Sequence, residues 1–329
     1  MTAAPETPDA GDRLLILYPE AAALRDLFDA RTPDLPTRYV ERAEDLPAAL
    51  ADFRPTVAFG TPSGAITKQA LKQALDFESV AWFSNGGAGV EHLLPWDPAV
   101  KTVTNASGVN ADFLGEYVVA SLLMMNIGFP AYGADQRARR WAERTWTPIA
   151  GKRLCVVGLG RVGREVARRA AELGMEVVGV RANPQPTEHV AQVFGADRAA
   201  DAVAGCDFVA VHAALTPQSE GLVGDAVFAA MKPGAHFLNA ARGPVVDEAA
   251  LIRALEAGRL GSAVLDVFET EPLPAASPLW DFDTVVITPH IADLVDDWFR
   301  RMAEAFCDNL DRRRAGAALA NIVDPTRGY

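Results

Sequence analysis

The sequence predicts an α/β protein with two domains, each built on a parallel sheet. Short apolar runs alternate with helix-length segments along most of the chain, which is the pattern of repeated βαβ units. At 329 residues, half of them apolar, the chain is long enough to form two cores. We expect a central domain over residues 105–291, inserted into a second domain made from residues 1–104 and 292–329.

The predicted strands are short apolar runs that are followed by polar or turn-forming residues. In the first domain they cover residues 14–17, 57–59 and 80–83. In the central domain they cover residues 153–157, 176–181, 208–211, 236–239, 263–267 and 285–288. Because helices are expected between several of these strands, the sheets are expected to be parallel.

Three further segments are predicted to form a buried helix, an exposed arm and a last helix. Residues 111–126 are apolar on nearly every side but too short to span a bilayer, which favours a buried helix. Residues 128–150 are rich in Arg and Trp and are expected to form an irregular, exposed arm. A last helix over about residues 292–314 would begin with aspartates and end with arginines, so that both ends complement the helix dipole.

The composition argues against several classes of protein. The net charge of −12, without a long run of Lys or Arg, argues against nucleic-acid binding. Cys155, Cys206 and Cys307 are odd in number and form no close pair, which fits a reducing cytoplasm and excludes a cysteine-based zinc site. Residues 1–11 lack the apolar core of a signal peptide, so we expect a frayed tail and no membrane partner. The histidines without a sequence partner for a metal site are His92, His189, His212 and His236.

A glycine-rich loop directly follows the first strand of the central domain. Residues 158–163 have the sequence GLGRVG and precede a helix with one apolar face. Gly158 permits a tight turn, Gly160 lets the backbone approach a pyrophosphate, and Gly163 lets helix and strand pack closely. The alternative is a glycine-rich turn without a ligand. The strand–loop–helix context favours a Rossmann-like domain whose helix N-terminus binds dinucleotide phosphates.

The end of the second central strand bears on which dinucleotide binds. An NAD site usually has Asp or Glu about 20 residues past the loop, bonded to the ribose 2′-hydroxyl. Here the strand leads into Arg181 and Asn183, and the first acid is Glu188. Arg181 can pair with a 2′-phosphate, and Asn183 can add a hydrogen bond. We therefore expect NADP(H) to be preferred over NAD(H); the alternative is that Arg181 is an exposed loop residue.

Three ionisable residues each follow a predicted strand. Arg242, Glu271 and His290 come soon after the strands at residues 236–239, 263–267 and 285–288, respectively. An Arg to hold a carboxylate, a His to move a proton and an acid to orient the His are what hydride transfer to a 2-keto acid needs. Ordinary alternatives are a surface ion pair, a packing histidine and a solvated loop acid. The occurrence of all three at strand ends favours the catalytic interpretation.

In this order, the motifs resemble those of the D-isomer-specific 2-hydroxyacid dehydrogenase family. The resemblance covers most of the chain and is strongest over residues 151–292. Besides the glycine loop, the matching segments are residues 86–92, 110–116, 216–217, 221–222, 238–247, 266–272 and 289–290. Residues 277–280 and 323–329 look most like the bacterial NADPH-dependent glyoxylate/hydroxypyruvate reductases. Glu91 stands where the substrate loop of the family usually has Asp, which is a mild departure.

The resemblance implies a role for each site residue. Arg242 would bind the substrate carboxylate and keto oxygen, and His290 would donate a proton to that oxygen. Glu271 would hydrogen-bond the far ring nitrogen of His290. Backbone N–H groups near Gly87 and Ala88 would grip the carboxylate. The implied cofactor-binding residues are Gly158, Gly160, Arg161, Val162, Gly163, Arg181, Asn183, Thr216, Ala240 and, near the nicotinamide, Asp266.

The expected activity is NADPH-dependent reduction of small 2-keto acids, glyoxylate and hydroxypyruvate foremost, to D-2-hydroxy acids. Two alternatives stay open: an NAD-dependent phosphoglycerate or lactate dehydrogenase of the same family, and a nucleotide-sensing binding protein. The Arg–Glu–His set argues against the sensor. The resemblance also implies a homodimer, with the 128–150 arm suited to an interface. The candidates for the wall of a substrate pocket are Trp82, Trp96, Trp141, Trp146 and Trp298.

Overall fold

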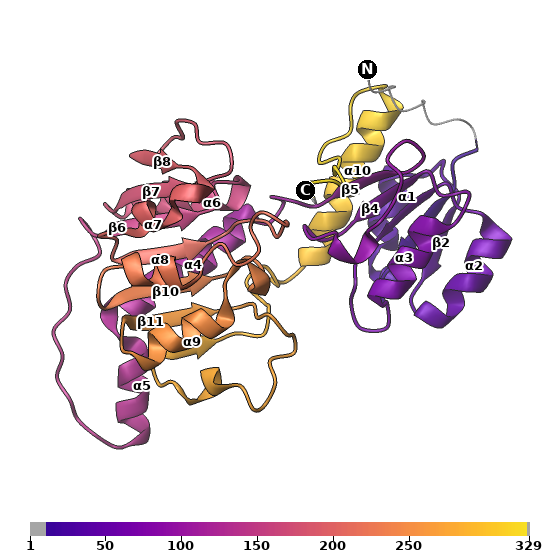
Figure 1. Ribbon diagram of the computed structural model, residues 1–329. Coiled ribbons are helices and arrows are strands. Elements are labelled where there is room, and N and C mark those ends of the chain that lie inside the picture. The colour runs from indigo at the N-terminus through magenta and orange to yellow at the C-terminus, as the bar shows by residue number, and fades with distance from the viewer. Residues whose placement is uncertain (1–10, 328–329) are drawn as a thin grey trace. The chain divides into compact units, whose positions relative to one another are not determined.

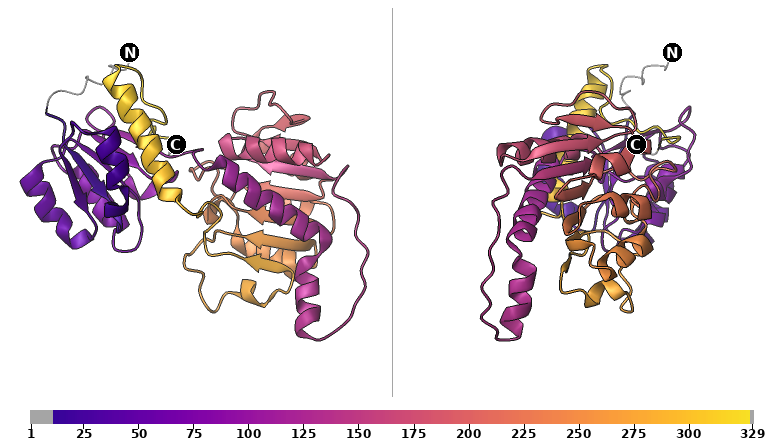
Figure 2. Two further views of the ribbon diagram at one scale, coloured as in Figure 1. Left: turned by 180° about the vertical axis from the view of Figure 1, so that it is seen from behind. Right: turned by 60° about the vertical axis from the view of Figure 1, so that its left-hand side comes forward.

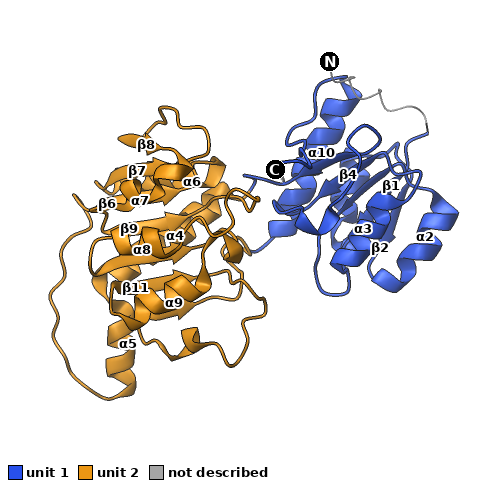
Figure 3. Cartoon of the chain, viewed as in Figure 1, with its two compact units in different colours: residues 1–109, 296–329 blue, residues 110–295 orange. Residues whose placement is uncertain are grey.

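The computed structural model describes residues 11–327, which form two compact units (Figure 3). The terminal unit comprises the residues up to Val109 and those from Asp296 onward, and the central unit comprises Asn110–Val295. Both boundaries fall a few residues later than the expected ones at 104/105 and 291/292. The expected frayed tail, apart from Gly11, lies outside the described residues.

The terminal unit is built on a parallel sheet of five strands in the order β2-β1-β3-β4-β5 (Figure 1). Its strands are β1 (Leu14–Leu17), β2 (Thr37–Val40), β3 (Val57–Gly60), β4 (Trp82–Asn85) and β5 (Thr102–Asn105). Its helices are α1 (Arg25–Arg31), α2 (Leu46–Phe53), α3 (Lys68–Asp76) and α10 (Trp298–Arg314). Alternate residues of β1 enter opposite cores, Leu15 with α2 and α3 and Ile16 with α1 and α10, as the two-residue period of a strand requires.

The central unit is built on a parallel sheet of seven strands in the order β12-β11-β10-β9-β6-β7-β8. Its strands are β6 (Arg153–Val157), β7 (Glu176–Val180), β8 (Gln192–Phe194), β9 (Phe208–Val211), β10 (Ala235–Asn239), β11 (Leu260–Leu265) and β12 (Val285–Ile287). Its helices are α4 (Ala111–Ile127), α5 (Phe129–Arg137), α6 (Arg161–Glu172), α7 (Ala199–Val203), α8 (Asp225–Ala230) and α9 (Glu248–Glu256). Helices α4 and α6 lie side by side over one face (Figure 2), and α7, α8 and α9 pack on the other.

Short 3-10 helices join several of these elements. They lie at Ala21–Leu24, Ala43–Asp45, Glu91–Leu93, Ala196–Arg198, Gly243–Val245 and Pro278–Asp281. The α/β class and the parallel sheets that the sequence predicted are confirmed.

The strand order of the central sheet places a switch point between β6 and β9. From β6 the chain builds outward through β7 and β8, then crosses back to β9 and builds the other way to β12. In such open sheets ligands bind at the carboxyl ends of the strands on either side of this reversal. The glycine loop follows β6, so it lies at this point.

Two helical segments differ from the sequence prediction. Residues 128–150 were expected to be irregular throughout, but α5 occupies the first part, because Gly128 ends α4 in a left-handed conformation and Pro130 can start a new helix. The last helix was expected from about residue 292 but begins at Trp298. Its expected N-terminal aspartates therefore precede the helix, and only the arginines in its last turn complement the dipole.

The part of the 128–150 arm that follows α5 is held by hydrogen bonds where it leaves the helix. Asp135, which is 3% exposed, accepts hydrogen bonds from Arg140 (2.6 Å) and from Arg144. The Tyr132 hydroxyl donates to the carbonyl of Arg144 (3.2 Å). Figures 1 and 2 show the arm running back along α5 toward β6 as an extended strand-like segment without sheet partners.

Two of the three cysteines are neighbours in space, although they are far apart in sequence. Cys155 in β6 and Cys206 before β9 are fully buried, and the neighbouring Cys206 thiol and burial together raise the pKa of Cys155. All three thiols are free. Within residues 11–327, no single helix is long and apolar enough to cross a membrane; only the sharply bent pair α4–α5 has the length and composition.

Candidate active site

The glycine loop joins the carboxyl end of β6 to the N-terminus of α6. Gly158 has φ +104°, and a Cβ there would lie 2.4 Å from the backbone nitrogen of Ala213. A Cβ at Gly163 would lie 2.0 Å from the carbonyl oxygen of Gly158, so packing requires glycine at both positions. At Gly160 a Cβ would meet nothing within 4 Å, and no side chain caps α6. The loop thus leaves room beside uncapped N–H groups, which fits the pyrophosphate of a dinucleotide.

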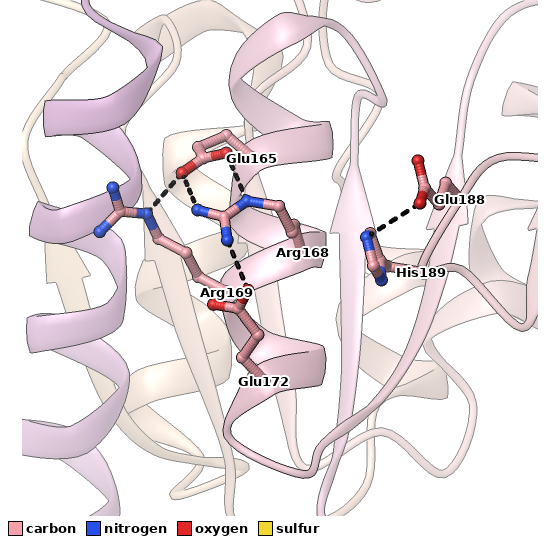
Figure 4. A network of polar contacts seen from close by, with 6 residues as sticks. All are labelled: Glu165, Arg168, Arg169, Glu172, Glu188 and His189. Atoms are coloured by element: carbon pink, nitrogen blue, oxygen red, sulfur yellow. Dashed lines mark hydrogen bonds and ion pairs between the residues drawn. The ribbon is translucent and has the colours of Figure 1, made fainter.

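Arg181 directly follows β7, beside the glycine loop. Its backbone N–H donates to the carbonyl of Phe194 (3.1 Å), which ties its main chain to β8. Among the described residues its guanidinium has neither a hydrogen-bond nor an ion-pair partner. Asn183 is exposed, and Glu188 turns its carboxylate toward His189, 3.5 Å away (Figure 4). This strand end therefore offers an unpaired cation and an amide.

The arginines on the outer surface of α6 are already engaged. Glu165 binds both Arg168 and Arg169 at 2.6 Å, and Arg168 also pairs with Glu172 (Figure 4). These guanidinium groups, Arg168 first, lower the pKa of Glu165 to about 2. The network packs against Gly115 of α4, where a Cβ would lie 3.0 Å from Nε of Arg169. Arg169 therefore packs at the α4–α6 contact, and Arg168 and Arg169, both engaged in ion pairs, are not candidates for binding phosphate.

Arg242 lies in the turn after β10, and its neighbours fix its main chain. Oδ1 of Asn239 accepts from the N–H of Ala241 (3.1 Å), and Nδ2 of Asn239 donates to the carbonyl of Arg242 (3.4 Å). A Cβ at Gly243 would lie 1.9 Å from the carbonyl of Phe268, so only glycine lets this turn pack on the segment after β11. Arg242 is half-buried and bonds the carbonyl of Ala241 (2.7 Å).

Glu271 and His290 are hydrogen-bonded to each other. Nδ1 of His290 lies 2.8 Å from Oε2 of Glu271, and Oε1 of Glu271 accepts from the N–H of Phe268 (3.1 Å). The His290 side chain is 43% exposed and that of Glu271 is 35% exposed, so the pair is open to a ligand. Since Nδ1 is engaged, Nε2 is the ring nitrogen left to contact a substrate. The hydrogen bond that the sequence predicted is present.

His290 is held in an unusual backbone conformation. Its φ is +56°, a left-handed value that costs a non-glycine residue roughly 1–3 kcal/mol. Its N–H donates to the carbonyls of Asp266 (2.9 Å) and Thr288 (3.1 Å). Such strain persists only where the surroundings enforce it, and it is concentrated at functional sites.

Asp266 enforces this turn, a role that the sequence did not predict for it. The sequence placed it near the nicotinamide as a cofactor contact. In the structure it is 1% exposed, and its carboxylate accepts hydrogen bonds from Thr288 Oγ1 (2.6 Å), Ile291 N (2.8 Å) and Ala292 N (3.0 Å). The carboxylate is thus occupied within the protein, and it positions the segment that carries His290.

A half-buried tyrosine extends this network to α4. The Tyr117 hydroxyl lies 2.7 Å from Oγ1 of Thr288. Because the Thr288 hydroxyl has one proton and gives it to Asp266, Tyr117 must be the donor. Burial raises the pKa of Tyr117, which keeps the hydroxyl protonated and able to donate.

The predicted substrate loop belongs to the terminal unit. Gly87 is half-buried and Ala88 is exposed in the loop that follows β4. At Gly86 a Cβ would lie 3.1 Å from Cβ of Thr61 and 3.2 Å from the Phe299 ring, so this position has little room for a side chain.

The other predicted cofactor residues lie on loops of the central unit. Arg161 is exposed and Val162 is half-buried at the start of α6, and Ala240 is half-buried after β10. Thr216 forms a turn in which its backbone N–H donates to Oγ of Ser219 (2.8 Å). All of these loops follow carboxyl ends of strands in one parallel sheet.

Two of the tryptophans that were candidates for a pocket wall lie in opposite environments. Trp82 is fully buried in the terminal unit and donates from Nε1 to Thr104 (3.0 Å), so it is a core residue and its candidacy for a pocket wall was wrong. Trp141 is 94% exposed on the arm. Burial lowers the pKa of His212 and of His236 to about 4, so both half-buried histidines are neutral at pH 7. Within residues 11–327 no cluster of side chains suited to a metal ion occurs.

Much of the central unit matches a known protein family. Residues 119–292 match the family described as "D-isomer specific 2-hydroxyacid dehydrogenase, NAD binding domain". The chain belongs to the D-isomer-specific 2-hydroxyacid dehydrogenase family. The chain is 32% identical to D-3-phosphoglycerate dehydrogenase of Rattus norvegicus over 272 residues, which are 79% of this chain and 50% of that protein. It spans about half the length of that curated relative.

Solved structures resemble this chain over almost its whole length. A D-isomer specific 2-hydroxyacid dehydrogenase from Xanthobacter autotrophicus Py2, in complex with NADPH and MES, is 32% identical with a TM-score of 0.82, and the match covers 97% of this chain and 100% of that one. A family member from Aeromonas salmonicida is 29% identical with a TM-score of 0.83, covering 96% and 100%. An NADPH-dependent glyoxylate/hydroxypyruvate reductase from Sinorhizobium meliloti is 23% identical with a TM-score of 0.79, covering 97% and 100%, which shows the fold alone.

Sequence analysis missed the residues that support the site. Thr288 ends the predicted strand at residues 285–288, but nothing in the sequence pairs it with Tyr117. An aromatic residue in an apolar helix usually belongs to a core, so Tyr117 gives no separate signal. Asn239 could have been suspected, because Asn often bonds the backbone of the turn that it begins.

Proposed function

We propose that the dehydrogenase reduces small 2-keto acids, glyoxylate and hydroxypyruvate foremost, to D-2-hydroxy acids with NADPH. The observation that carries this proposal is the 2.8 Å hydrogen bond between Glu271 and His290. The pair lies beyond the carboxyl ends of β11 and β12, in the sheet whose β6 and β10 lead into the glycine loop and Arg242. A nucleotide sensor needs the glycine loop but has no use for an oriented proton donor.

The chemistry follows from the groups that the central unit presents. A bound nicotinamide would supply the hydride for the keto carbon. Arg242 would hold the substrate carboxylate and polarise the keto oxygen through its planar fork. Nε2 of His290 would donate a proton to that oxygen as its negative charge develops, and would take one back in the oxidation direction. Glu271, bonded to Nδ1, would keep Nε2 aimed at the oxygen.

A phosphorylated substrate is the alternative to glyoxylate and hydroxypyruvate. The identity to D-3-phosphoglycerate dehydrogenase favours a phosphorylated 2-hydroxy acid and NAD as the second candidate. The test is a panel of 2-keto acids that includes the phosphorylated analogue of hydroxypyruvate, assayed with NADPH and NADH side by side. We expect the highest kcat/KM for glyoxylate or hydroxypyruvate with NADPH. A higher value for the phosphorylated acid would favour the alternative.

Changing Arg181 to Asp is expected to reverse or erase the preference for NADPH. A carboxylate would then face the 2′-phosphate in place of a guanidinium, and one charge-assisted hydrogen bond is worth about 1.5–3 kcal/mol, or roughly 10–100-fold in affinity. The preference is supported by the neighbour crystallised with NADPH. The measurement is kcat/KM for each cofactor at saturating glyoxylate.

The control for this change is Arg198→Asp. Arg198 is another arginine of the central unit, exposed and paired with Asp201 (2.8 Å), so its replacement should leave the cofactor ratio unchanged. A wild-type enzyme that works about tenfold better with NADH would contradict the proposed role of Arg181.

We also propose that the dehydrogenase is a homodimer in which the arm is covered by a second copy. Trp141 is 94% exposed and Trp146 is 53% exposed, although Asp135 fixes the base of the arm. Exposed aromatic side chains on an ordered segment are typical of interfaces. Light scattering should give twice the chain mass of 35.1 kDa, and Trp141→Ser should weaken the dimer by about tenfold or more. A monomer mass at every concentration would contradict this.

A further inference from the structure

In the terminal unit, two buried carboxamides hold the loop that follows β4. Asn85, 1% exposed, donates from Nδ2 to the carbonyl oxygens of Gly87 and Gly89, each at 2.9 Å. Asn105 donates from Nδ2 to the carbonyl oxygen of Ala88 at 2.7 Å. Asn85 and Asn105 are paired in register at the carboxyl ends of β4 and β5, so both amides reach the loop from one edge of the sheet. Three successive carbonyls are therefore turned toward the strands.

The direction of these carbonyls fixes the direction of the N–H groups. In a trans peptide the C=O of one residue and the N–H of the next point opposite ways. The N–H groups of Ala88 and Gly89 thus point away from the two Asn side chains. Among the described residues, the N–H groups of Gly87, Ala88 and Gly89 donate to no acceptor. Successive free N–H groups of this kind form a concavity that binds anions.

The unpaired acceptor of Asn85 shows that stability alone does not explain this residue. Its Oδ1 is buried and has no hydrogen-bond partner within residues 11–327. A buried polar atom without a partner disfavours the folded state. Asn105 differs, because its Oδ1 accepts from the N–H of Ser107 (3.1 Å). Asn85 is therefore best explained by what its Nδ2 does for the loop.

We propose that Asn85 and Asn105 are positioning residues that shape this loop to bind the carboxylate of the substrate. They would not touch the substrate; they would act by holding the carbonyls inward so that the N–H groups of Ala88 and Gly89 face the carboxylate. The inference rests on the proposed function, because that function supplies the carboxylate. It adds two residues that the motifs of the sequence do not mark.

The test measures carboxylate binding apart from turnover. Oxalate, a small dicarboxylate that does not react, is titrated by calorimetry into the full-length protein saturated with NADPH. Asn85→Ala removes the amide group that donates both hydrogen bonds, and it buries no charge. Asn105→Asp keeps the shape of the side chain but replaces the donating amide nitrogen with a carboxylate oxygen, which only accepts. For each variant we expect the Kd of oxalate and the KM of glyoxylate to rise roughly 10–100-fold, the worth of one or two charge-assisted hydrogen bonds. The effect on kcat should be smaller.

A matched control separates positioning from general loss of structure. Asn309 is 6% exposed in the same unit, and its side chain bonds both the N–H and the carbonyl of Ala320 without touching the loop. Asn309→Asp should lower the melting temperature as much as Asn105→Asp does, yet leave oxalate binding and KM unchanged. In all variants the Kd of NADPH should stay at the wild-type value, because the glycine loop belongs to the central unit.

The outcomes distinguish the two proposals. Wild-type protein that binds oxalate, with weaker binding in Asn85→Ala, supports the inference even if no 2-keto acid is reduced, and in that case the proposed function fails alone. Equal oxalate binding by wild type, Asn85→Ala and Asn105→Asp would overturn the inference while leaving the proposed function intact. Wild-type protein that does not bind oxalate at all would also overturn it.

Discussion

Replacing His290 by alanine is expected to lower kcat for glyoxylate reduction by about 10²–10⁴-fold, the usual contribution of a general acid. The reason is geometric as well as chemical. Nδ1 of His290 is bonded to Glu271, and the turn at φ +56° is enforced by Asp266, so Nε2 is held in one direction. The measurement is the steady-state rate of NADPH oxidation at saturating substrate.

A second variant separates loss of the proton donor from loss of the turn. Asn tolerates the left-handed backbone of this position better than most residues, but its amide cannot supply a proton. His290→Asn should therefore be as slow as His290→Ala while melting close to the wild type. The Kd of NADPH should not change in either. A His290→Ala enzyme with the wild-type kcat would remove the central role assigned to this residue.

Replacing Arg242 by alanine is expected to raise KM and lower kcat together, so that kcat/KM falls about 10²–10³-fold. Arg242 would touch the carboxylate in the ground state and the keto oxygen in the transition state, and losing one side of such a charge pair costs roughly 2–5 kcal/mol. Arg242→Lys keeps the charge but loses the planar fork, so it should recover only part of the activity.

The control for Arg242 lies in α9 of the same unit. Arg253 is exposed and pairs with Asp225 (2.8 Å), so Arg253→Ala should leave kcat/KM near the wild-type value. An Arg242→Ala enzyme whose KM for glyoxylate equals that of the wild type would show that another group binds the carboxylate.

The strands that the sequence predicted are those whose pattern is unambiguous. The central strands of both sheets are buried on both faces and appear as continuous apolar runs, such as β1 and β9. Three strands escaped prediction for a physical reason. β2 is partly exposed, β8 has three residues at a sheet edge, and β5 is mostly polar, so none of them forms an apolar run.

The site was predictable only where its chemistry is fixed by residue type and position in the chain. Arg242, Glu271 and His290 each follow a strand, and parallel strands place such residues at one edge of the sheet. Asp266 could not be assigned in this way, because whether a carboxylate faces a ligand or is saturated by its own chain depends on burial. The same holds for Asn85, whose role follows from which carbonyls it meets in three dimensions.

The most direct test of the account is the product of hydroxypyruvate reduction by the wild-type enzyme. NADPH oxidation is followed by absorbance, and the glycerate formed is resolved by chiral chromatography. We predict one equivalent of D-glycerate for each NADPH consumed, at a higher kcat/KM than with NADH. Formation of L-glycerate, or no NADPH oxidation with either hydroxypyruvate or glyoxylate, would contradict it.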